Sequence, residues 1–140
     1  MNMTKKIHAV GIVLEDEKGQ MLVLKRRAHV PEGATWGLVG GKVKDGLDPA
    51  STAANKAQEE IGYSVDTSKL QFFKSYHWDR DDLDLTFDVY KLTTHKDDVD
   101  LKINQDGHTE YKWETPANLY GYKDLMRGLY PILEDIYKVK

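Results

Sequence analysis

The sequence contains no cysteine, and this absence excludes several kinds of chemistry. Without a thiol the chain can form no disulfide, no thiolate nucleophile and no zinc–thiolate site. A composition free of cysteine fits the reducing cytoplasm, where we expect the protein to work. The charges are nearly balanced, with 20 Lys and Arg against 23 Asp and Glu and a net charge of -3. Such a chain offers no electrostatic reason to bind nucleic acid as its main partner.

Long hydrophobic runs are missing as well. The apolar run Ala9–Leu14 ends before Glu15, and nothing in the chain approaches the roughly 20 apolar residues of a membrane span. Lys5 and Lys6 precede this run, as the basic residues of a signal peptide would, but no small-residue cleavage site follows it. The pattern favours a buried first strand over a signal peptide, and we expect no membrane partner.

The composition is that of one globular domain. Of the 140 residues 40% are hydrophobic and 31% charged, so we expect a single domain with one core over residues 1–140. Apolar and alternating patterns predict strands at residues 7–14, 21–24, 70–78, 83–90 and 108–113. The first two strands are joined by turn-forming residues and are expected to form a hairpin.

Two of these segments carry more detailed expectations. Strand 70–78 is expected to place one set of side chains on one face (Leu70, Phe72, Tyr76, Trp78) and another set on the opposite face (Phe73, Ser75, His77). The acidic residues 79–82 that follow form either a solvated hairpin tip or a metal-binding loop. Near the end, Thr115 and Pro116 predict a short helix, and residues 122–138 predict a second helix that Pro131 should kink or divide.

The stretch Val39–Tyr63 is the most informative part of the sequence. Gly40 and Gly41 permit a tight turn or a close approach of the backbone to a ligand. Asp48 and Pro49 are typical of the first residues of a helix, and Gly62 is typical of a helix end. Between these ends, small and apolar residues recur at helical spacing and form one narrow face (Ala50, Ala53, Ala54, Ala57, Ile61). The sequence therefore predicts a glycine-rich turn followed by a helix that packs closely on a sheet.

The polar side of this helix carries Lys56, Glu59 and Glu60. The side chains of the adjacent glutamates diverge by about 100°, so both cannot face the sheet. Two carboxylates near a helix C-terminus are destabilised by the helix dipole and by each other, and either a divalent cation or a nearby ammonium group would relieve this. Lys56 is within ion-pair range of both. Judged from the helix alone, these glutamates could form either a surface pair with Lys56 or a metal site.

This stretch resembles the Nudix box, whose family pattern is Gly, five residues, Glu, seven residues, then Arg-Glu-apolar-any-Glu-Glu-any-Gly-apolar. Five positions match this pattern: Gly41, Ala57, Glu59, Glu60 and Gly62. Three positions that are usually charged differ, because the first Glu is replaced by Leu47 and the Arg-Glu pair by Asn55 and Lys56. The chain is thus similar to the Nudix (MutT-like) hydrolases but has a degenerate box.

The resemblance implies an α/β fold of the α+β kind, an α/β/α sandwich with a mixed β-sheet. It also implies Mg²⁺ or Mn²⁺ as cofactor, with Glu59 and Glu60 as the catalytic pair and as metal ligands, and with the Gly40 carbonyl as a third ligand. In the family the metal neutralises the substrate's pyrophosphate and lowers the pKa of the attacking water.

The three departures from the box differ in their consequences. In the family the first Glu and the Arg often pair, and here both partners are replaced, by Leu47 and Asn55, so no orphan charge is left. We therefore expect an intact scaffold. Lys56 stands where the family has a further acid, and a charged lysine has no lone pair with which to bind a metal. This substitution removes one ligand and adds a positive charge.

Other residues are weaker candidates for the site. Arg26, Arg27, Lys42 and Lys56 are candidate contacts to the substrate's phosphates, although basic residues at strand ends are usually only solvated. An additional carboxylate from outside the box could come from any of three residues (Asp81, Asp106, Glu110). Three aromatic residues could stack on a base, although strand aromatics more often belong to the core (Trp36, Tyr76, Trp78).

Two functions remain open at this point. The first is a divalent-metal-dependent hydrolase that cleaves the pyrophosphate of a nucleoside diphosphate linked to another moiety. The second is a non-catalytic module of the same fold that binds a nucleotide or a related phosphate without turnover, which the Lys56 substitution would favour. Both have a small-molecule partner, and the oligomeric state is open, with a homodimer as one option. The sequence favours the hydrolase.

Overall fold

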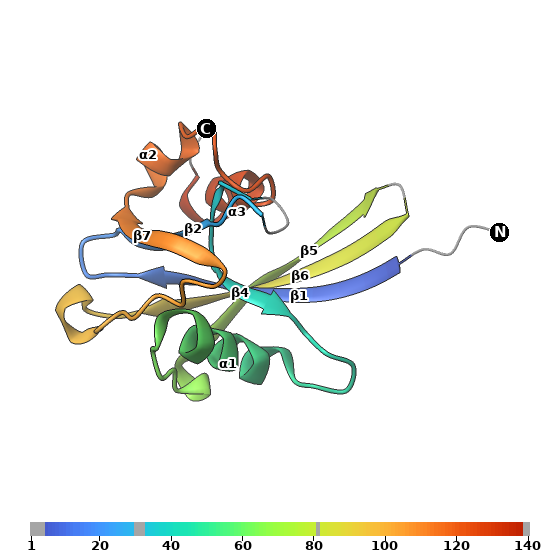
Figure 1. Cartoon of the computed structure of the whole chain (residues 1–140), viewed down its shortest axis with the longest axis horizontal. Coiled ribbons are helices and arrows are strands. Elements are labelled where there is room, and N and C mark those ends of the chain that lie inside the picture. The colour runs from blue at the N-terminus through green and yellow to red at the C-terminus, as the bar shows by residue number, and fades with distance from the viewer. Residues whose placement is uncertain (1–4, 30–32, 81, 139–140) are drawn as a thin grey trace.

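A computed structural model describes residues 5–29, 33–80 and 82–138. Its described strands form one mixed sheet (Figure 1), in the order β3-β2-β1-β6-β5, with β4 paired to β1 and β7 paired to β2. The strands are β1 (Lys5–Glu15), β2 (Met21–Arg26), β3 (Trp36–Gly37), β4 (Val39–Lys42), β5 (Gln71–Arg80), β6 (Leu83–Thr93) and β7 (His108–Glu114).

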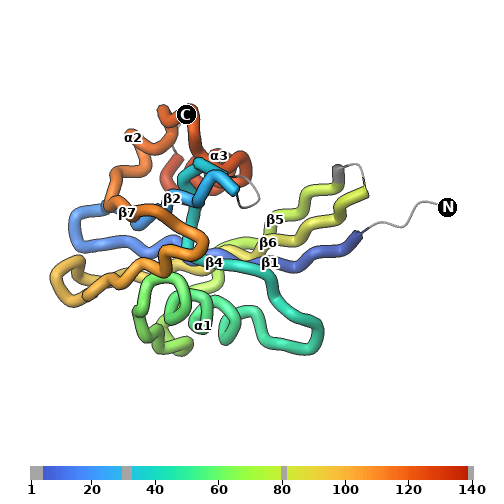
Figure 2. The backbone as a smooth tube through the Cα atoms, viewed as in Figure 1, coloured from blue at the N-terminus to red at the C-terminus, as the bar shows by residue number. Residues whose placement is uncertain are grey.

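The centre of the sheet is a parallel pair of long strands. β1 pairs with β6 along its whole length, from Lys5 opposite Leu83 to Glu15 opposite Thr93. The predicted hairpin of β1 and β2 is confirmed, but its only described register pair is Glu15 with Met21. Beyond the turn the two strands separate, because β4 pairs with β1 and β7 pairs with β2. The ends of β1, β5 and β6 extend beyond the helices (Figure 2).

The helices cover both faces of this sheet. α1 (Pro49–Ile61) lies on one side, whereas α2 (Pro116–Tyr120) and α3 (Leu129–Tyr137) lie on the other (Figure 1). Two short 3-10 helices, η1 (Thr67–Lys69) and η2 (Lys96–Asp98), lie in the connections. The expected α/β/α sandwich with a mixed sheet is confirmed. Among the described residues, no helix is long and apolar enough to cross a membrane.

Local sequence explains the ends of α1 as predicted. The Asp48 side chain accepts a hydrogen bond from the Ser51 N–H, and Pro49 occupies the first turn. Gly62 ends the helix in the left-handed conformation, with φ 67°, which a glycine adopts without strain. The buried face of α1 consists mainly of small residues, so the helix axis can approach the sheet closely.

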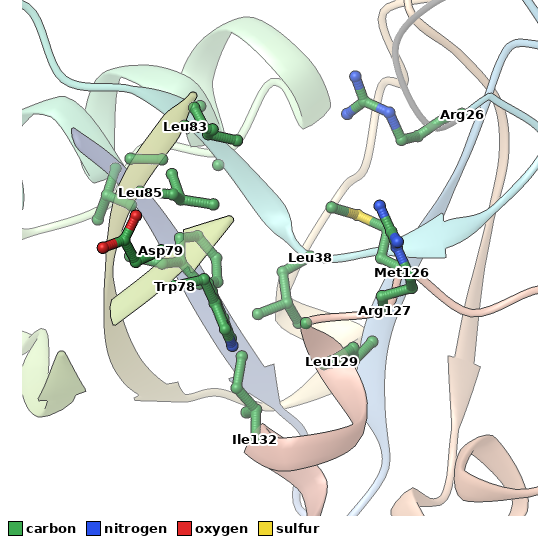
Figure 3. A pocket seen from close by; sticks show the side chains of 16 residues that line it. Arg26, Leu38, Trp78, Asp79, Leu83, Leu85, Met126, Arg127, Leu129 and Ile132 are labelled. Carbon is green, nitrogen blue, oxygen red and sulfur yellow. The ribbon is translucent and has the colours of Figure 1, made fainter. Parts of the chain in front are cut away.

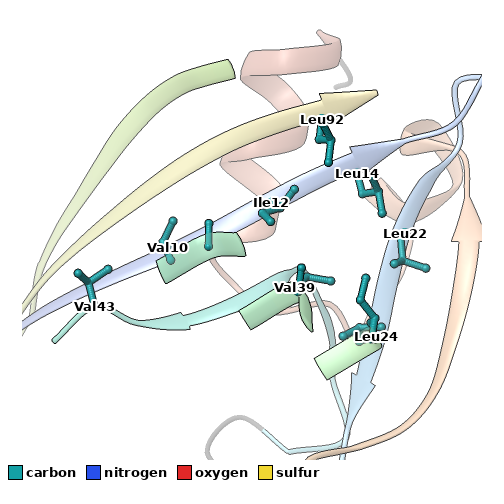
Figure 4. Packing of buried hydrophobic residues seen from close by; sticks show 11 residues of the cluster. Val10, Ile12, Leu14, Leu22, Leu24, Val39, Val43 and Leu92 are labelled. Atoms are coloured by element: carbon teal, nitrogen blue, oxygen red, sulfur yellow. The ribbon is translucent and has the colours of Figure 1, made fainter. Parts of the chain in front are cut away.

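Two hydrophobic clusters flank the sheet. We call the first the α1-side cluster (Figure 4); its buried members are Val10, Ile12, Leu14, Leu22, Leu24, Val39, Val43, Ala53, Ala57, Ile61 and Leu92. We call the second the α3-side cluster; its buried members are Val13, Met21, Val23, Trp36, Tyr76, Val89, Leu119, Leu125, Leu129, Ile132 and Leu133. Alternation along β1 sends Val10 and Ile12 to one cluster and Val13 to the other, because successive side chains of a strand point to opposite faces.

Two expectations about local structure are wrong. The register of β5 against β6 shifts between Phe72 and Lys74, which reverses the face of the residues before it. Phe73, not Phe72, therefore packs against the α3-side cluster with Tyr76 and Trp78, while Phe72 is 57% exposed.

The C-terminal helix is also shorter than predicted. It begins at Leu129 rather than at residue 122, and Pro131 lies in its first turn instead of dividing a longer helix. A proline is tolerated there because the first N–H groups of a helix have no partner within the helix. The short helix expected after Thr115 is confirmed as α2, with the Thr115 side chain accepting a hydrogen bond from the Asn118 N–H.

Candidate functional site

The glycine-rich strand β4 brings the box next to the central strand of the sheet. A Cβ atom built on Gly40 would lie 2.0 Å from the Val10 carbonyl oxygen, so only glycine permits this approach. A Cβ on Gly41 would lie 2.7 Å from Cε of Lys56, because the lysine stem lies across this residue. Gly40 is therefore needed for packing on β1, whereas a side chain at Gly41 would only displace the flexible Lys56, and neither glycine has a positive φ.

Glu60 is the glutamate that contacts this strand. Its Oε1 accepts a hydrogen bond from the Gly40 N–H at 3.0 Å, and the residue is half-buried. Burial raises the pKa of Glu60 to about 7, while the Gly40 N–H and the charges of Lys56 and Arg26 act in the opposite direction. A desolvated carboxylate with a raised pKa is a group that a bound cation would stabilise in its charged form.

Glu59 has a different environment. Its side chain is 61% exposed, and its Oε2 lies 3.3 Å from Nζ of Lys56. The two adjacent glutamates thus diverge as predicted, one toward β4 and the other toward solvent and the lysine. The surface Lys–Glu pair and the inward-facing carboxylate therefore coexist on one helix.

A cavity of about 470 Å³ opens beside the box, between the sheet and α3 (Figure 3). Gly40 and Gly41 belong to its wall, so the cavity begins at the strand that Glu60 contacts. The rest of the wall is mostly apolar, and its residues are Ala9, Val10, Arg26, Leu38, Trp78, Asp79, Leu83, Leu85, Phe87, Met126, Arg127, Gly128, Leu129 and Ile132.

The predicted phosphate contacts differ in whether they line the cavity. Arg26 lines the cavity and lies close enough to Glu60 to influence its pKa. Lys56 reaches Gly41 and Glu59 instead. Arg27 donates from Nε to the Gln105 carbonyl, and Lys42 is exposed at the end of β4, and neither lines the cavity.

The predicted aromatic residues separate in the same way. Trp78 lines the cavity, as a base-stacking residue would. Trp36 is buried beneath the ammonium groups of Lys25 and Lys112, which lie 5.5 Å and 4.8 Å from its ring. Tyr76 is also buried, and its hydroxyl donates to Asp135 at 2.7 Å. The last two residues are therefore structural.

A further carboxylate does not join the two glutamates in the described part of the chain. Asp106 and Glu110 are exposed, and Asp81 lies outside the described residues. No group of three or more Asp, Glu, His or Cys among the described residues could hold a metal ion. Two carboxylates are nevertheless enough for Mg²⁺, which usually completes its shell with waters and substrate phosphates. Of the three proposed ligands, Glu60 and Gly40 lie together, whereas Glu59 points toward Lys56 and would have to turn to share one ion with them.

Sequence reasoning missed much of the cavity wall. Leu38, Phe87, Met126 and Arg127 were not candidates, because an isolated apolar or basic residue carries no motif. The alternation in β6 did indicate that Leu83, Leu85 and Phe87 share one face, but it could not show that this face borders a cavity.

Comparisons with known proteins agree with this geometry. The sequence model described as NUDIX domain matches residues 5–136. The fold is similar to that of a MutT protein from Methanosarcina mazei Go1, with a TM-score of 0.83, 20% identity, and 96% of this chain and 95% of that chain covered. It is also similar to a MutT NUDIX hydrolase from Burkholderia pseudomallei, with a TM-score of 0.78, 21% identity, and 94% and 98% covered.

One curated relative matches a shorter segment. It is the CMP-5'-(N-acetyl-N-hydroxy-3-aminopropyl)phosphonate hydrolase of Streptomyces rubellomurinus, 46% identical over 55 residues. The match covers 39% of this chain and 27% of the relative, so it spans little more than a quarter of that protein's length.

Proposed function

The chain belongs to the NUDIX family, and we propose that it is a divalent-metal-dependent hydrolase of a nucleoside diphosphate linked to another moiety. The observation that carries the proposal is the position of Glu60. Its carboxylate binds the Gly40 N–H, and Gly40 also forms part of the wall of the 470 Å³ cavity. The carboxylate that we propose as a metal ligand and a space for an organic group therefore both adjoin one glycine-rich strand. A cytoplasmic location and a small-molecule substrate belong to the same proposal, and the oligomeric state stays open.

The residues of this chain have separate roles in the proposed reaction. Glu59, Glu60 and the Gly40 carbonyl would hold Mg²⁺ or Mn²⁺, which supplies charge neutralisation and an acidified water when bound. Arg26, which lies at the junction of Glu60 and the cavity, attracts the negatively charged phosphates. Arg27, Lys42 and Lys56 are basic groups nearer the outside, and Lys56 can turn from Glu59 toward a phosphate because its pair is exposed.

The bond changes follow from the substrate class. The oxygen of water forms a new bond to one phosphorus, and the bridging P–O bond breaks, so that two phosphorus-containing products leave. The water protons pass to a carboxylate or to solvent. The Streptomyces relative supports this class, because its name describes a hydrolase that acts on CMP joined to a phosphonate.

The test is turnover on a panel of nucleoside diphosphate sugars, dinucleotides, nucleoside triphosphates and CMP-linked phosphonates, with Mg²⁺ or Mn²⁺. We expect release of a nucleoside monophosphate or phosphate that a chelator abolishes and that Glu60→Gln lowers by about 10²–10³-fold. Glu17→Gln is the matched control, because Glu17 lies in the β1–β2 turn and accepts a hydrogen bond from the Lys96 N–H. Absence of turnover on the whole panel with both metals would contradict the proposal.

A binding module without turnover is the second candidate, and the Lys56–Glu59 pair favours it. The ammonium lies 3.3 Å from Glu59 and competes with a metal for that carboxylate. This function predicts that nucleotides raise the melting temperature without being hydrolysed, and that Lys56→Glu produces some hydrolysis. Lys18→Glu, in the β1–β2 turn, makes the same charge change as a control. No thermal shift with any phosphorylated ligand would exclude this candidate.

A further inference from the structure

We propose that the cavity beside Gly40 takes an aliphatic chain of the substrate rather than a nucleobase. This inference deepens the proposed function and rests on it, because the chain would be the moiety X attached to the diphosphate held at the box. The nucleoside, where the substrate has one, would then lie outside the cavity.

The chemistry of the cavity wall is the first argument. The described residues that line it include no Ser, Thr, Asn, Gln, Tyr or His. Four lining side chains carry nitrogen or oxygen, namely Arg26, Trp78, Asp79 and Arg127. The Asp79 carboxylate points away from the other labelled side chains (Figure 3), as expected for the neighbour of Trp78 on a strand. A base-reading set of amide and hydroxyl groups is thus missing from the described wall.

The missing polar partners matter because a nucleobase has several donors and acceptors on its edges. Groups that enter such a wall without partners lose their hydrogen bonds to water, which weakens binding. An alkyl chain has no such loss. It gains about fourfold in affinity for each methylene group that it buries, which corresponds to about 0.8 kcal/mol.

The distribution of charge is the second argument. Arg26 and Arg127 lie on one side of the cavity, and Trp78, Leu83 and Leu85 lie on the other (Figure 3). The basic side would attract the phosphates, because both arginines line the cavity and Gly40 and Gly41 of the box belong to the same wall. A ligand with a charged head and an apolar tail matches this arrangement, with the head toward the arginines and the tail toward Trp78.

Two glycines make room for the aromatic part of the wall. A Cβ atom on Gly128 would lie 3.1 Å from Cη2 of Trp78, and one on Gly11 would lie 2.5 Å from Cζ of Phe87. Both rings therefore pack against bare backbone instead of filling the cavity. A side chain at either position would have to displace the ring beside it.

The experiment is a binding series that does not depend on turnover. Its probes are n-alkyl esters of methylenebisphosphonate, from ethyl to decyl, whose P–C–P bridge cannot be hydrolysed. The adenosine, guanosine, cytidine and uridine esters are compared by titration calorimetry with Mg²⁺. We expect affinity to rise about fourfold per methylene until the cavity is full. We also expect the best alkyl ester to bind more tightly than every nucleoside ester.

Variants of the wall sharpen the test. Ala9→Leu and, separately, Leu83→Phe reduce the space and should shift the optimum to a shorter chain, while Phe72→Leu, on the exposed side of β5, should leave the series unchanged. The wild-type series decides the matter even where a variant does not fold. Affinity that is independent of chain length, or a nucleoside ester that binds best, would overturn the inference. A rise with chain length and no turnover on the hydrolase panel would contradict the proposed function alone.

Discussion

The two sides of the sheet differ in how tightly they are packed. On the α1 side, the small residues of a well-capped helix close against β1 and β4, and an opening among Ile12, Val39 and Ile61 holds only about 10 Å³. On the α3 side, bulky aromatic residues and a short helix enclose a space of about 470 Å³. The packed side fixes the position of the glutamates, and the hollow side leaves room for a ligand. A hydrolase needs both, because its reacting groups must be held rigidly while its substrate enters and leaves.

The largest effect should come from the glutamate where the two sides meet. Glu60→Gln is expected to lower kcat by about 10²–10³-fold, because it removes a fixed charge at the proposed metal site. Glu59→Gln should cost less, since this side chain is mostly exposed and already paired with Lys56. Steady-state kinetics on the substrate found in the panel would measure both. An equal loss in the two variants would show that the structural difference between them has no functional meaning.

The next prediction concerns packing itself. Ile61→Ala truncates a buried residue of the α1-side cluster and should lower the free energy of unfolding by about 2–5 kcal/mol. Leu85→Ala, at a half-buried position that faces the cavity, should cost about 1 kcal/mol, because less surrounding structure is lost. Urea denaturation would measure both values. A larger loss for Leu85 would mean that the α3 side is the tighter one.

The helix cap on the α1 side provides a smaller effect. Asp48→Ala removes the acceptor of the Ser51 N–H and should cost about 1 kcal/mol of stability. Asp45→Ala, an exposed residue of the same connection, makes the same chemical change without a cap and serves as the control. Thermal or urea unfolding of the two variants would be compared, and equal losses would refute the capping role.

The smallest effect concerns the polar contacts that hold α3. The Tyr76 hydroxyl and then the Lys74 ammonium hold the pKa of Asp135 below its usual range. A lowered folded-state pKa stabilises the fold above the unfolded-state value, and this contribution is lost as the pH falls through the folded-state value. Asp135→Asn should therefore flatten the loss of stability as the pH falls below the usual range of an aspartate pKa, measured by urea unfolding. Lys74→Gln, which keeps the Tyr76 donor, should flatten it less.

Features that depend on local sequence could be predicted, whereas features that depend on distant contacts could not. The box and its helix were predicted closely, because Asp48, Pro49, Gly62 and the small residues between them act over a few positions along the chain. The bulge in β5 was not predicted. The register shift between Phe72 and Lys74 is fixed by pairing with β6 and not by the local preference of these residues. Pro131 was placed in the wrong part of its helix for a similar reason, since the helix begins only where Leu129 reaches the α3-side cluster.

The candidate site also contains residues that the sequence could predict and residues that it could not. Glu59, Glu60 and Gly40 could be selected because the resemblance to the Nudix box lies within one segment, although the inward position of Glu60 required the structure. The cavity could not be predicted, because its wall comes from segments as far apart as Ala9 and Ile132. A single residue such as Arg127 can be assigned to the cavity only when the fold shows which other residues surround it.

The parallel pairing of β1 with β6 also has a consequence for synthesis. β1 is made first, yet its partner over residues 83–93 emerges only much later. At about 5–20 residues per second, the interval is roughly 4–16 s. During this time β2 pairs with β1 only at Glu15, and β4 can cover residues 9–12 of β1. The apolar N-terminal strand of a newly made chain is therefore a segment that chaperones can reach before the sheet closes.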